Sequence, residues 1–270
     1  MNRTALSAPP ARAGLARHSI GILLKALEAG KVLAAAAARV SVGHLAALLV
    51  AAAHTGCGGT GEHFPLDPGI NWLYEIDVRT MDGEFAKRYP VRTGSPTRFR
   101  DEAVYPQVTL AGERTYYARR DDGIWRVARQ ARASNAPVPY LQPSLVLPAT
   151  LDGDVEWQGR TVTRVLEHTG PPQETLFQIR EVVPMRYRLT VEDSPVEVPA
   201  GTFSDCVKVV GEGTVNADVG NYIGRTTIRV ETTDWYAPGV GLVRAERTET
   251  TTSEAIDFGR MVMELATLTR

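Results

Sequence analysis

The segment Thr232-Thr233-Asp234-Trp235-Tyr236-Ala237-Pro238-Gly239-Val240-Gly241-Leu242-Val243-Arg244 decides the fold class of this chain. Its residue types are typical of a β-strand that ends in an aromatic pair, turns at Pro238-Gly239 and returns as a second strand. Proline presets the φ angle needed at the second position of a turn, and glycine adopts the positive φ of the third position in a type II turn. The segment offers no nucleophile, metal ligand or phosphate-binding loop, so it predicts structure rather than chemistry.

The apolar side chains along residues 226–235 change face before this turn is reached. Ile228 and Val230 share one face of the expected strand, whereas Trp235 stands on the other. A β-bulge places an extra residue in a strand and re-aims the side chains beside it. We therefore expect a bulge near Thr233-Asp234.

Alternation with a period of two recurs elsewhere in the chain. Trp72, Tyr74 and Ile76 occupy alternate positions after the turn Asp67-Pro68-Gly69, which places them on one face of a strand. Further turns are predicted at Asp82-Gly83, Asp121-Asp122-Gly123, Asp152-Gly153, Gln158-Gly159 and Pro199-Ala200-Gly201. Short strands joined by such turns predict an antiparallel all-β domain.

The sequence after residue 57 contains no segment with helical periodicity long enough for the crossovers of a parallel sheet. Residues 129–144 include Pro137, Pro139 and Pro143, and we expect them to form a loop that crosses one sheet edge. Met261, Met263 and Leu265 are expected to lie on one final strand.

Charge is distributed unevenly along the chain. Residues 1–56 contain six Lys or Arg and one acidic residue, whereas residues 57–270 carry a net charge of −6. A nucleic-acid-binding domain is expected to be basic on its folded part. The mildly acidic body therefore argues against nucleic acid as a partner.

An apolar run over residues 40–53 follows Arg39 and has the length of the hydrophobic region of a signal peptide. It ends at His54-Thr55-Gly56-Cys57, before a glycine-rich stretch. This ending resembles the lipobox of bacterial lipoproteins, in which the cysteine becomes the lipidated N-terminus of the mature chain. Thr55 and Gly56 fit that pattern, whereas His54 stands where the family usually has an aliphatic residue. The resemblance implies lipidation at Cys57.

Two other forms of the N-terminal region remain open. A signal peptidase could cleave after Ala53 at an Ala-x-Ala site, or residues from about Val32 onward could form an uncleaved anchor helix. All three forms export the folded part. Because a leader of this length exceeds the usual ~15–30 residues, we also expect translation to start downstream, near Val32. The expected organisation is a leader or signal segment at 1–56, a flexible tether at 57–63 and a single antiparallel β domain at 64–270.

Three motifs together resemble a recurrent group of bacterial envelope lipoproteins. They are residues 65–74 (PLDPGINWLY), residues 198–203 (VPAGTF) and residues 235–243 (WYAPGVGLV). The resemblance covers roughly residues 57–270 and implies a curved antiparallel sheet or open barrel of about ten to twelve strands. Such a fold is similar in outline to periplasmic lipoprotein carriers that hold acyl chains against a concave face. No functional residue is carried over, since the group has no assigned catalytic set.

The residue types that usually carry catalysis are sparse. His63 and His168 are the two histidines beyond the leader, and neither has the spacing of a zinc site. His168 is expected in a surface turn, and Cys206 is expected to be a buried, unreactive thiol between valines. A hydrolase would need Glu167 and His168, or Cys206, to converge in a cleft. We therefore expect no enzyme activity, no catalytic residue, no metal and no cofactor.

Two sets of side chains could be either structural or ligand-binding. The tryptophans are expected in the core rather than on a concave ligand face; they are Trp72, Trp125, Trp157 and Trp235. Several strand arginines are expected on a solvated face rather than at an anion site; they are Arg126, Arg164, Arg186, Arg188 and Arg229.

These observations together predict an exported, membrane-anchored lipoprotein of the bacterial cell envelope. It would face the periplasm at the outer membrane, and its non-enzymatic β domain would bind a hydrophobic ligand or an envelope partner. The alternative is a structural or assembly factor that acts through its sheet edges. The motif residues are assigned a structural role in turns and aromatic packing; they are Asp67, Pro68, Gly69, Trp72, Pro199, Gly201, Trp235, Tyr236, Pro238 and Gly239.

Overall fold

The computed structural model describes residues 60–170 and 174–270. The expected leader, the anchor helix and the lipidation at Cys57 lie outside these residues. Within the described ranges, no helix has both the length and the apolar character needed to cross a bilayer.

Strands make up about two thirds of the described fold and nearly all of its regular secondary structure, which confirms the all-β class. The elements are α1 Thr60–His63, β1 Asn71–Thr80, β2 Gly83–Thr93, β3 Thr97–Phe99, β4 Glu102–Thr109, β5 Arg114–Arg120, β6 Gly123–Gln130, β7 Val138–Pro148, β8 Val155–Val162, β9 Glu167–Gly170, β10 Thr175–Gln178, β11 Val182–Val191, β12 Val196–Val198, β13 Gly201–Phe203, β14 Val207–Asp218, β15 Arg225–Ala237, β16 Gly241–Thr251 and β17 Phe258–Thr269.

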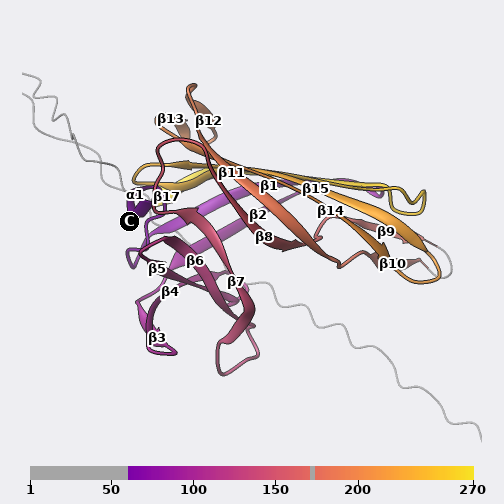
Figure 1. Ribbon diagram of the computed structural model, residues 1–270, viewed down its shortest axis with the longest axis horizontal. Helices are drawn as coiled ribbons and strands as arrows, with labels where there is room; N and C mark the ends of the chain where they lie inside the picture. The colour runs from indigo at the N-terminus through magenta and orange to yellow at the C-terminus, as the bar shows by residue number, and fades with distance from the viewer. Residues whose placement is uncertain (1–59, 171–173) are drawn as a thin grey trace, which may run out of the picture. The chain divides into compact units, whose positions relative to one another are not determined.

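Twelve strands form one antiparallel sheet in the order β7-β6-β5-β4-β2-β1-β17-β16-β15-β14-β11-β8, and β3 pairs with β4 beside this path. The two end strands, β7 and β8, approach each other, so the sheet nearly closes into a barrel. In Figure 1 the long strands run side by side, and β3–β7 lie to one side of them. The curved sheet or open barrel expected from the sequence is therefore observed.

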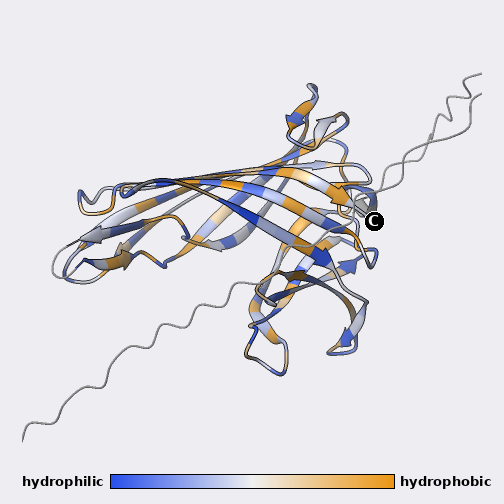
Figure 2. Ribbon diagram, turned by 180° about the vertical axis from the view of Figure 1, so that it is seen from behind, coloured by the Kyte–Doolittle hydropathy of each residue, from blue (hydrophilic) through white to orange (hydrophobic). Residues whose placement is uncertain are grey.

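One face of the long strands, called the inner face below, points toward the interior of this curved sheet. Cross-strand partners share a face, so the register defines it. One row of partners runs across five strands: Ile76, Met263, Ala245, Asp234 and Val209. Figure 2 shows hydrophobic and hydrophilic residues alternating along the long strands, as a sheet with two different faces requires.

Different elements cover the two ends of the inner face. At one end, Ile124 and Leu147 from β6 and β7 join Leu189 and Val209 in a buried cluster. At the other end, residues 163–170, called the strap below, lead from β8 into β9 and run across the inner face. The hairpin β12–β13 lies on the opposite, outer face (Figure 1).

The turn at Pro238-Gly239 has the predicted geometry. Gly239 has φ +72°, and the backbone N–H of Val240 donates to the carbonyl of Ala237 at 3.2 Å, which closes the turn. The Trp72 indole donates to the Val240 carbonyl at 2.8 Å. The first aromatic motif therefore bonds directly to the last one.

The expected bulge exists, but its position and its effect differ from the prediction. The register shifts between Trp235 and Tyr236, because Trp235 pairs with Arg244 whereas Tyr236 pairs with Leu242. The extra residue is thus Val243 on β16 rather than a residue near Thr233-Asp234. Trp235 points outward through ordinary alternation, since it is an odd number of residues from Ile228 and Val230.

Three further expectations about local structure were wrong. Much of residues 129–144 is strand, because β7 pairs with β6 and its prolines lie on an edge where no ladder donor is needed. Gln158-Gly159 lies within β8, where the Tyr187 ring sits only 2.9 Å from the position of a Cβ on Gly159. The tether ends before His63, which is buried in α1 and lies 3.1 Å from the Asp205 carbonyl.

Candidate functional site

A buried ion pair on β16 anchors the polar part of the inner face. The side chains of Arg247 and Glu249 are only 7% and 0% exposed, and the Arg247 Nε donates to Glu249 Oε1. The other two guanidinium nitrogens of Arg247 donate to Thr161 Oγ1 at 3.0 Å and to the Val162 carbonyl at 2.8 Å. All three nitrogens are therefore used within the protein, as a buried cation requires.

Glu249 also fixes the strap to the inner face. Its carboxylate accepts the backbone N–H of Arg164 at 2.9 Å and that of Val165 at 3.0 Å. Gly259 on β17 permits this approach, because a Cβ there would lie 2.0 Å from the Val165 carbonyl oxygen. The Arg247–Glu249 pair consequently holds residues 161–165 against β16 and β17.

Two other arginines meet at this place without a carboxylate partner. Arg126 pairs in register with Tyr117, whose ring lies 4.9 Å from that of Phe64 in the interior cluster, so Arg126 also faces inward. Its guanidinium lies 5.6 Å from the ring centroid of Tyr140, but its buried Nε has no hydrogen-bond partner. Arg164, on the strap, is exposed to solvent. No Asp or Glu in the described ranges forms an ion pair with Arg126 or Arg164.

The proximity of these arginines affects the ionisation of Arg164. The surrounding protein removes part of the hydration of Arg164, and the positive charges of Arg247 and Arg126 add to this effect, so the pKa of Arg164 is lowered. Glu249 opposes the shift but already serves Arg247 and the strap. Positive charge therefore accumulates on the inner face beyond what the nearby carboxylates compensate.

Aromatic side chains share the inner face with Arg126. Trp157 stacks on Tyr187, with ring centroids 5.6 Å apart and an interplanar angle of 23°. The buried Nε1 of Trp157 has no hydrogen-bond partner. Burial raises the pKa of Tyr117 and of Tyr187, so both phenols are neutral near pH 7. These groups offer N–H and O–H donors rather than a nucleophile.

Asp234 is an acidic residue whose ionisation is affected by Arg247, Arg164 and Arg126. It is half-buried on the inner face of β15. Desolvation raises its pKa to about 6, although Arg247, Arg164 and Arg126 act in the opposite direction. Asp234 therefore carries only part of a negative charge in mildly acidic solution. We call Arg126, Arg164, Asp234 and the surrounding Tyr117, Tyr187 and Trp157 the arginine site.

The chemistry of the arginine site is that of an anion receptor. A guanidinium presents its N–H groups in a fork that matches a carboxylate or a phosphate. In addition, Arg126 Nε and Trp157 Nε1 are buried donors that lack acceptors. The residues that the structure describes contain no cluster of three metal-ligating side chains. The site can thus accept a negatively charged group with several hydrogen-bond acceptors.

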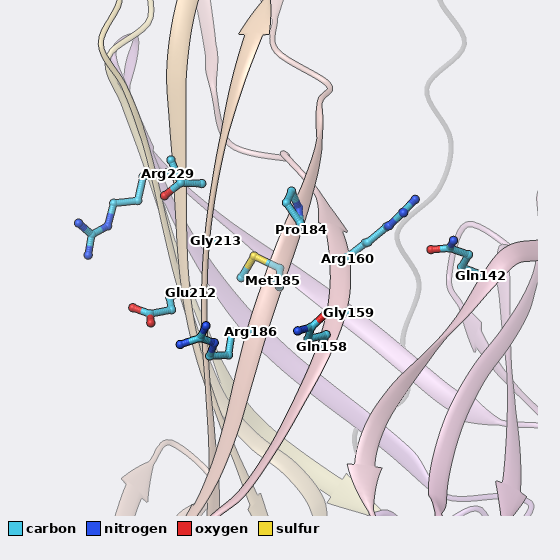
Figure 3. Close-up of a pocket in the computed structure, with 11 residues that line it drawn as sticks. Gln142, Gln158, Gly159, Arg160, Pro184, Met185, Arg186, Glu212, Gly213 and Arg229 are labelled. Atoms are coloured by element: carbon cyan, nitrogen blue, oxygen red, sulfur yellow. The ribbon is translucent and has the colours of Figure 1, made fainter.

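A hollow lies on the outer face, where the ladder between β11 and β14 ends (Figure 3). The ladder between them runs from Arg186 and Glu212 toward the start of β14 and does not extend to Pro184. Gly213 permits a close crossing, since a Cβ there would lie 2.2 Å from the Pro184 carbonyl. The hollow has a volume of about 760 Å³ and is lined by Gln142, Gln158, Gly159, Arg160, Pro184, Met185, Arg186, Glu212, Gly213, Thr214 and Arg229.

The outer hollow is a weaker candidate than the arginine site. Its charged side chains, Arg160, Arg186, Glu212 and Arg229, are all exposed. Arg229 is already paired with Glu231 at 2.6 Å. Exposed charges in water contribute little binding energy, at most about 1 kcal/mol per pair. None of the side chains that line this hollow has a buried donor without a partner, in contrast to Arg126 and Trp157.

The motif residues named from the sequence lie away from the arginine site, with one exception. Pro199 and Gly201 form the β12–β13 turn on the outer face. Trp235 also points outward, where its indole donates to Glu192 at 3.1 Å. The remaining turn residues Asp67, Pro68, Gly69, Pro238 and Gly239 lie in the two corners joined by Trp72. The exception is Tyr236, on the inner face beside Asp234.

The three residues considered for a hydrolase do not form a common cleft. His168 Nδ1 lies 2.6 Å from Asp82 Oδ1, at the tip of the β1–β2 hairpin. His168 is therefore paired rather than a free turn residue. Cys206 is buried at 1% exposure, as predicted, and desolvation together with Asp205 and Glu192 raises the pKa of its thiol to about 11. Among the described contacts, none joins Cys206 to Glu167 or His168.

Sequence reasoning missed the arginine site. Both arginines were expected on a solvated face; Arg164 is indeed exposed, whereas the register places Arg126 on the inner face, half-buried. Of the four tryptophans, Trp72 is in the core as expected, whereas Trp125, Trp157 and Trp235 are only partly buried. The one available signal was the spacing of Arg126 from Ile124, since residues two apart on a strand share a face.

Comparison with known proteins gives limited information. Residues 180–252, from the segment before β11 to the end of β16, match the family model described as DUF3108-like. No protein of curated function matches the chain. A crystal structure of a candidate lipoprotein from Parabacteroides distasonis aligns at 14% identity with a TM-score of 0.33. A candidate exported protein with a YmcC-like fold from Bacteroides fragilis aligns at 16% identity with a TM-score of 0.32. Each alignment covers 77% of this chain and 98% of the other, and at these values neither assigns a family or an activity.

Proposed function

We propose that this protein is an exported lipoprotein of the cell envelope, tethered to a membrane through Cys57, whose β domain binds a ligand without catalysing a reaction. The observation that carries the binding role is a pair of arginines, the half-buried Arg126 and the exposed Arg164, that form no ion pair with a carboxylate in the described chain. The inner face also carries two buried donors, Arg126 Nε and Trp157 Nε1, that have no acceptor.

Unpaired donors of this kind are unfavourable for an isolated fold. A buried polar group without a partner costs about 1–3 kcal/mol, and an unpaired charge costs more. The same sheet satisfies Arg247 completely. An acceptor supplied by a bound ligand would offset the cost at Arg126 and Trp157, which supports a binding role for the arginine site.

The location rests on the N-terminal sequence. An apolar run after Arg39 leads to Thr55-Gly56-Cys57, and glycines follow. Acylation of Cys57 after removal of the preceding residues would place the β domain at the membrane surface, on the periplasmic side and, we infer, at the outer membrane.

The alternative role, assembly through a sheet edge, has less support. One edge of β2 pairs with β1. On its other edge, residues 91–93 pair with β4, whereas residues 83–90 have no ladder partner in the described chain. This free stretch carries Lys87 and Pro90. Lysine and proline on an exposed strand are devices that hinder the addition of a further strand. The ligand-binding role is therefore our main proposal.

Two measurements test the proposal. Labelling with a radioactive fatty acid should mark the full chain in a bacterial host but not its Cys57→Ser variant; equal labelling of both would refute the anchor. Native mass spectrometry of protein released from membranes should reveal a bound small molecule, lost in the Arg126→Gln/Arg164→Gln variant and kept in Arg186→Gln. Retention of the molecule by the double variant would refute binding at the arginine site.

A further inference from the structure

The charges at the arginine site limit how much negative charge a ligand can bring. Glu249 neutralises Arg247 through the direct ion pair. This leaves the positive charges of Arg126 and Arg164, which Asp234 offsets in part. One anionic group, such as a carboxylate or a phosphate monoester, would balance the remainder, whereas a polyanion would meet Asp234 and Glu249.

The site continues into an exposed strip of β2 that carries Phe85, Lys87 and Tyr89 on the inner face. Tyr89 pairs in register with Tyr74, and Phe85 pairs with Val78, so both rings lie on the inner face. Phe85 is nevertheless 46% exposed and Tyr89 is 37% exposed, because no ladder partner lies beside this half of β2 in the described chain. Their partners Tyr74 and Val78 are buried. Exposed rings on an inward face are available to cover an apolar ligand.

Tyr89 connects this strip to the arginines. It lies close enough to Arg164 for each to influence the ionisation of the other. Phe85 and Tyr89 stand four residues apart on one face of β2, so a chain lying along them would extend about 13 Å at 3.3 Å per residue. The two rings thus lead toward the positive charge of Arg164, with Lys87 between them on the same face.

We propose that the ligand of this protein is a single-chain anionic amphiphile, whose one anionic head group lies between Arg126 and Arg164 and whose acyl chain lies along Tyr89 and Phe85. This inference rests on the proposed function and gives its ligand class. The head group accepts from both guanidinium groups and from Trp157 Nε1, while the chain covers the two exposed rings. A free fatty acid and a lysophospholipid with a terminal phosphate share this chemistry.

The test compares four probes, each below its micellar concentration, on the full chain with the substitution Cys57→Ser, which carries no lipid anchor and can be assayed in detergent-free buffer. Oleate and oleoyl lysophosphatidic acid carry the chain and an anionic head, oleyl alcohol carries the chain alone, and inorganic phosphate carries the charge alone. Titration calorimetry should give at least tenfold tighter binding for one of the two anionic amphiphiles than for oleyl alcohol or phosphate. The tighter of the two identifies the head group.

Variants assign the contacts. Arg126→Gln and Arg164→Gln should each weaken the anionic amphiphile about tenfold and leave oleyl alcohol unchanged. Phe85→Ser should weaken both chain-bearing probes about threefold to tenfold. Arg229→Gln is the matched control, since it removes an exposed arginine of the outer face, and it should change no affinity. Far-ultraviolet circular dichroism of each variant confirms that the sheet is intact.

Each other outcome overturns a stated part. Equal binding of oleyl alcohol and the anionic amphiphiles, or no effect of Arg126→Gln and Arg164→Gln, would refute the anionic head while leaving a ligand-binding function. Phosphate as tight as the amphiphiles would refute the chain and identify a small-anion site. Failure of all four probes to bind would refute the amphiphile, and the proposed function would then stand only if native mass spectrometry shows another bound molecule.

Discussion

Arg247 and Arg126 lie on the same inner face but differ in their hydrogen bonding. Arg247 is buried with all three guanidinium nitrogens bonded, to Glu249, Thr161 and Val162. Arg126 has a buried Nε without a partner and contacts the face of Tyr140. The first arginine completes a structural network, whereas the second keeps a donor for which the described chain supplies no acceptor.

The contrast predicts different effects of the two arginines on the stability of the ligand-free protein. Breaking a buried ion pair leaves a charge uncompensated, which typically costs about 3–5 kcal/mol. Residues that serve a ligand instead tend to reduce the stability of the free protein. Variants at Arg247 and at Arg126 should therefore change the free energy of unfolding by amounts that differ in sign as well as in size.

The largest effect is expected from Glu249→Gln. The variant removes the carboxylate that neutralises Arg247, so a buried guanidinium loses its partner and the strap loses a charged acceptor. We expect the free energy of unfolding, measured in urea, to fall by about 3–5 kcal/mol. Glu231→Gln, in the exposed pair with Arg229, is the control and should lose less than about 1 kcal/mol. Similar losses in both variants would erase the contrast between buried and exposed pairs.

The next largest effect concerns the contact between the strap and β17 at Gly259. In Gly259→Ala the new methyl group would meet the Val165 carbonyl at 2.0 Å, so the strap must shift. We expect a loss of about 1–3 kcal/mol, as for other overpacked sites. Hydrogen exchange at the amides of Arg164 and Val165 should become faster. Unchanged exchange there would show that Glu249 does not depend on this close approach.

A pH-dependent effect is expected at Asp234. Because its pKa is raised to about 6, above the ~3.9 of an unfolded chain, the folded state binds an extra proton between these values. Stability should thus decrease as the pH rises through this window. Asp234→Asn removes that loss and should be more stable by about 1–3 kcal/mol at pH 7.5. The gain should disappear below about pH 4; a gain independent of pH would contradict the assignment.

The smallest effect, and the sharpest test of the comparison, is expected from Arg126→Met. Removing an unpaired inward charge while keeping an apolar side chain should raise the ligand-free stability by roughly 0.5–1 kcal/mol. Arg247→Met should lower it, since Glu249 would then lack its cation. Thermal unfolding of ligand-free protein distinguishes the two signs. A loss of stability in Arg126→Met comparable to that in Arg247→Met would make both arginines structural.

Local sequence patterns predicted the strands and corners because their causes are local. Pro238-Gly239 and Asp82-Gly83 form turns through their own backbone preferences, and alternation placed Trp72 and Tyr74 on a buried face. The strand β7 was missed because its prolines lie on an edge, where the missing N–H has no consequence. The bulge was misplaced because its extra residue, Val243, belongs to the partner strand.

The arginine site could not be predicted for a different reason. Arg126 and Arg164 are 38 residues apart in the sequence, and they meet only because the sheet curls and the strap crosses its inner face. The carboxylate that fixes the strap, Glu249, comes from a third distant segment. Periodicity within β6 placed Arg126 on the same face as Ile124, but nothing local indicated that this face would be enclosed.

The position of β1 in the sheet has a consequence for how the chain folds. Its strand lies between β2 and β17, so the first long strand pairs with the last one along its whole length. Pairings between distant segments form slowly, because the intervening chain must lose conformational entropy before the stabilising contacts form. Until β17 has been synthesised, one edge and one apolar face of β1 stay exposed. A chain that ends before Phe258 would therefore present these surfaces to chaperones and proteases, which makes the C-terminal strand the checkpoint for completing the fold.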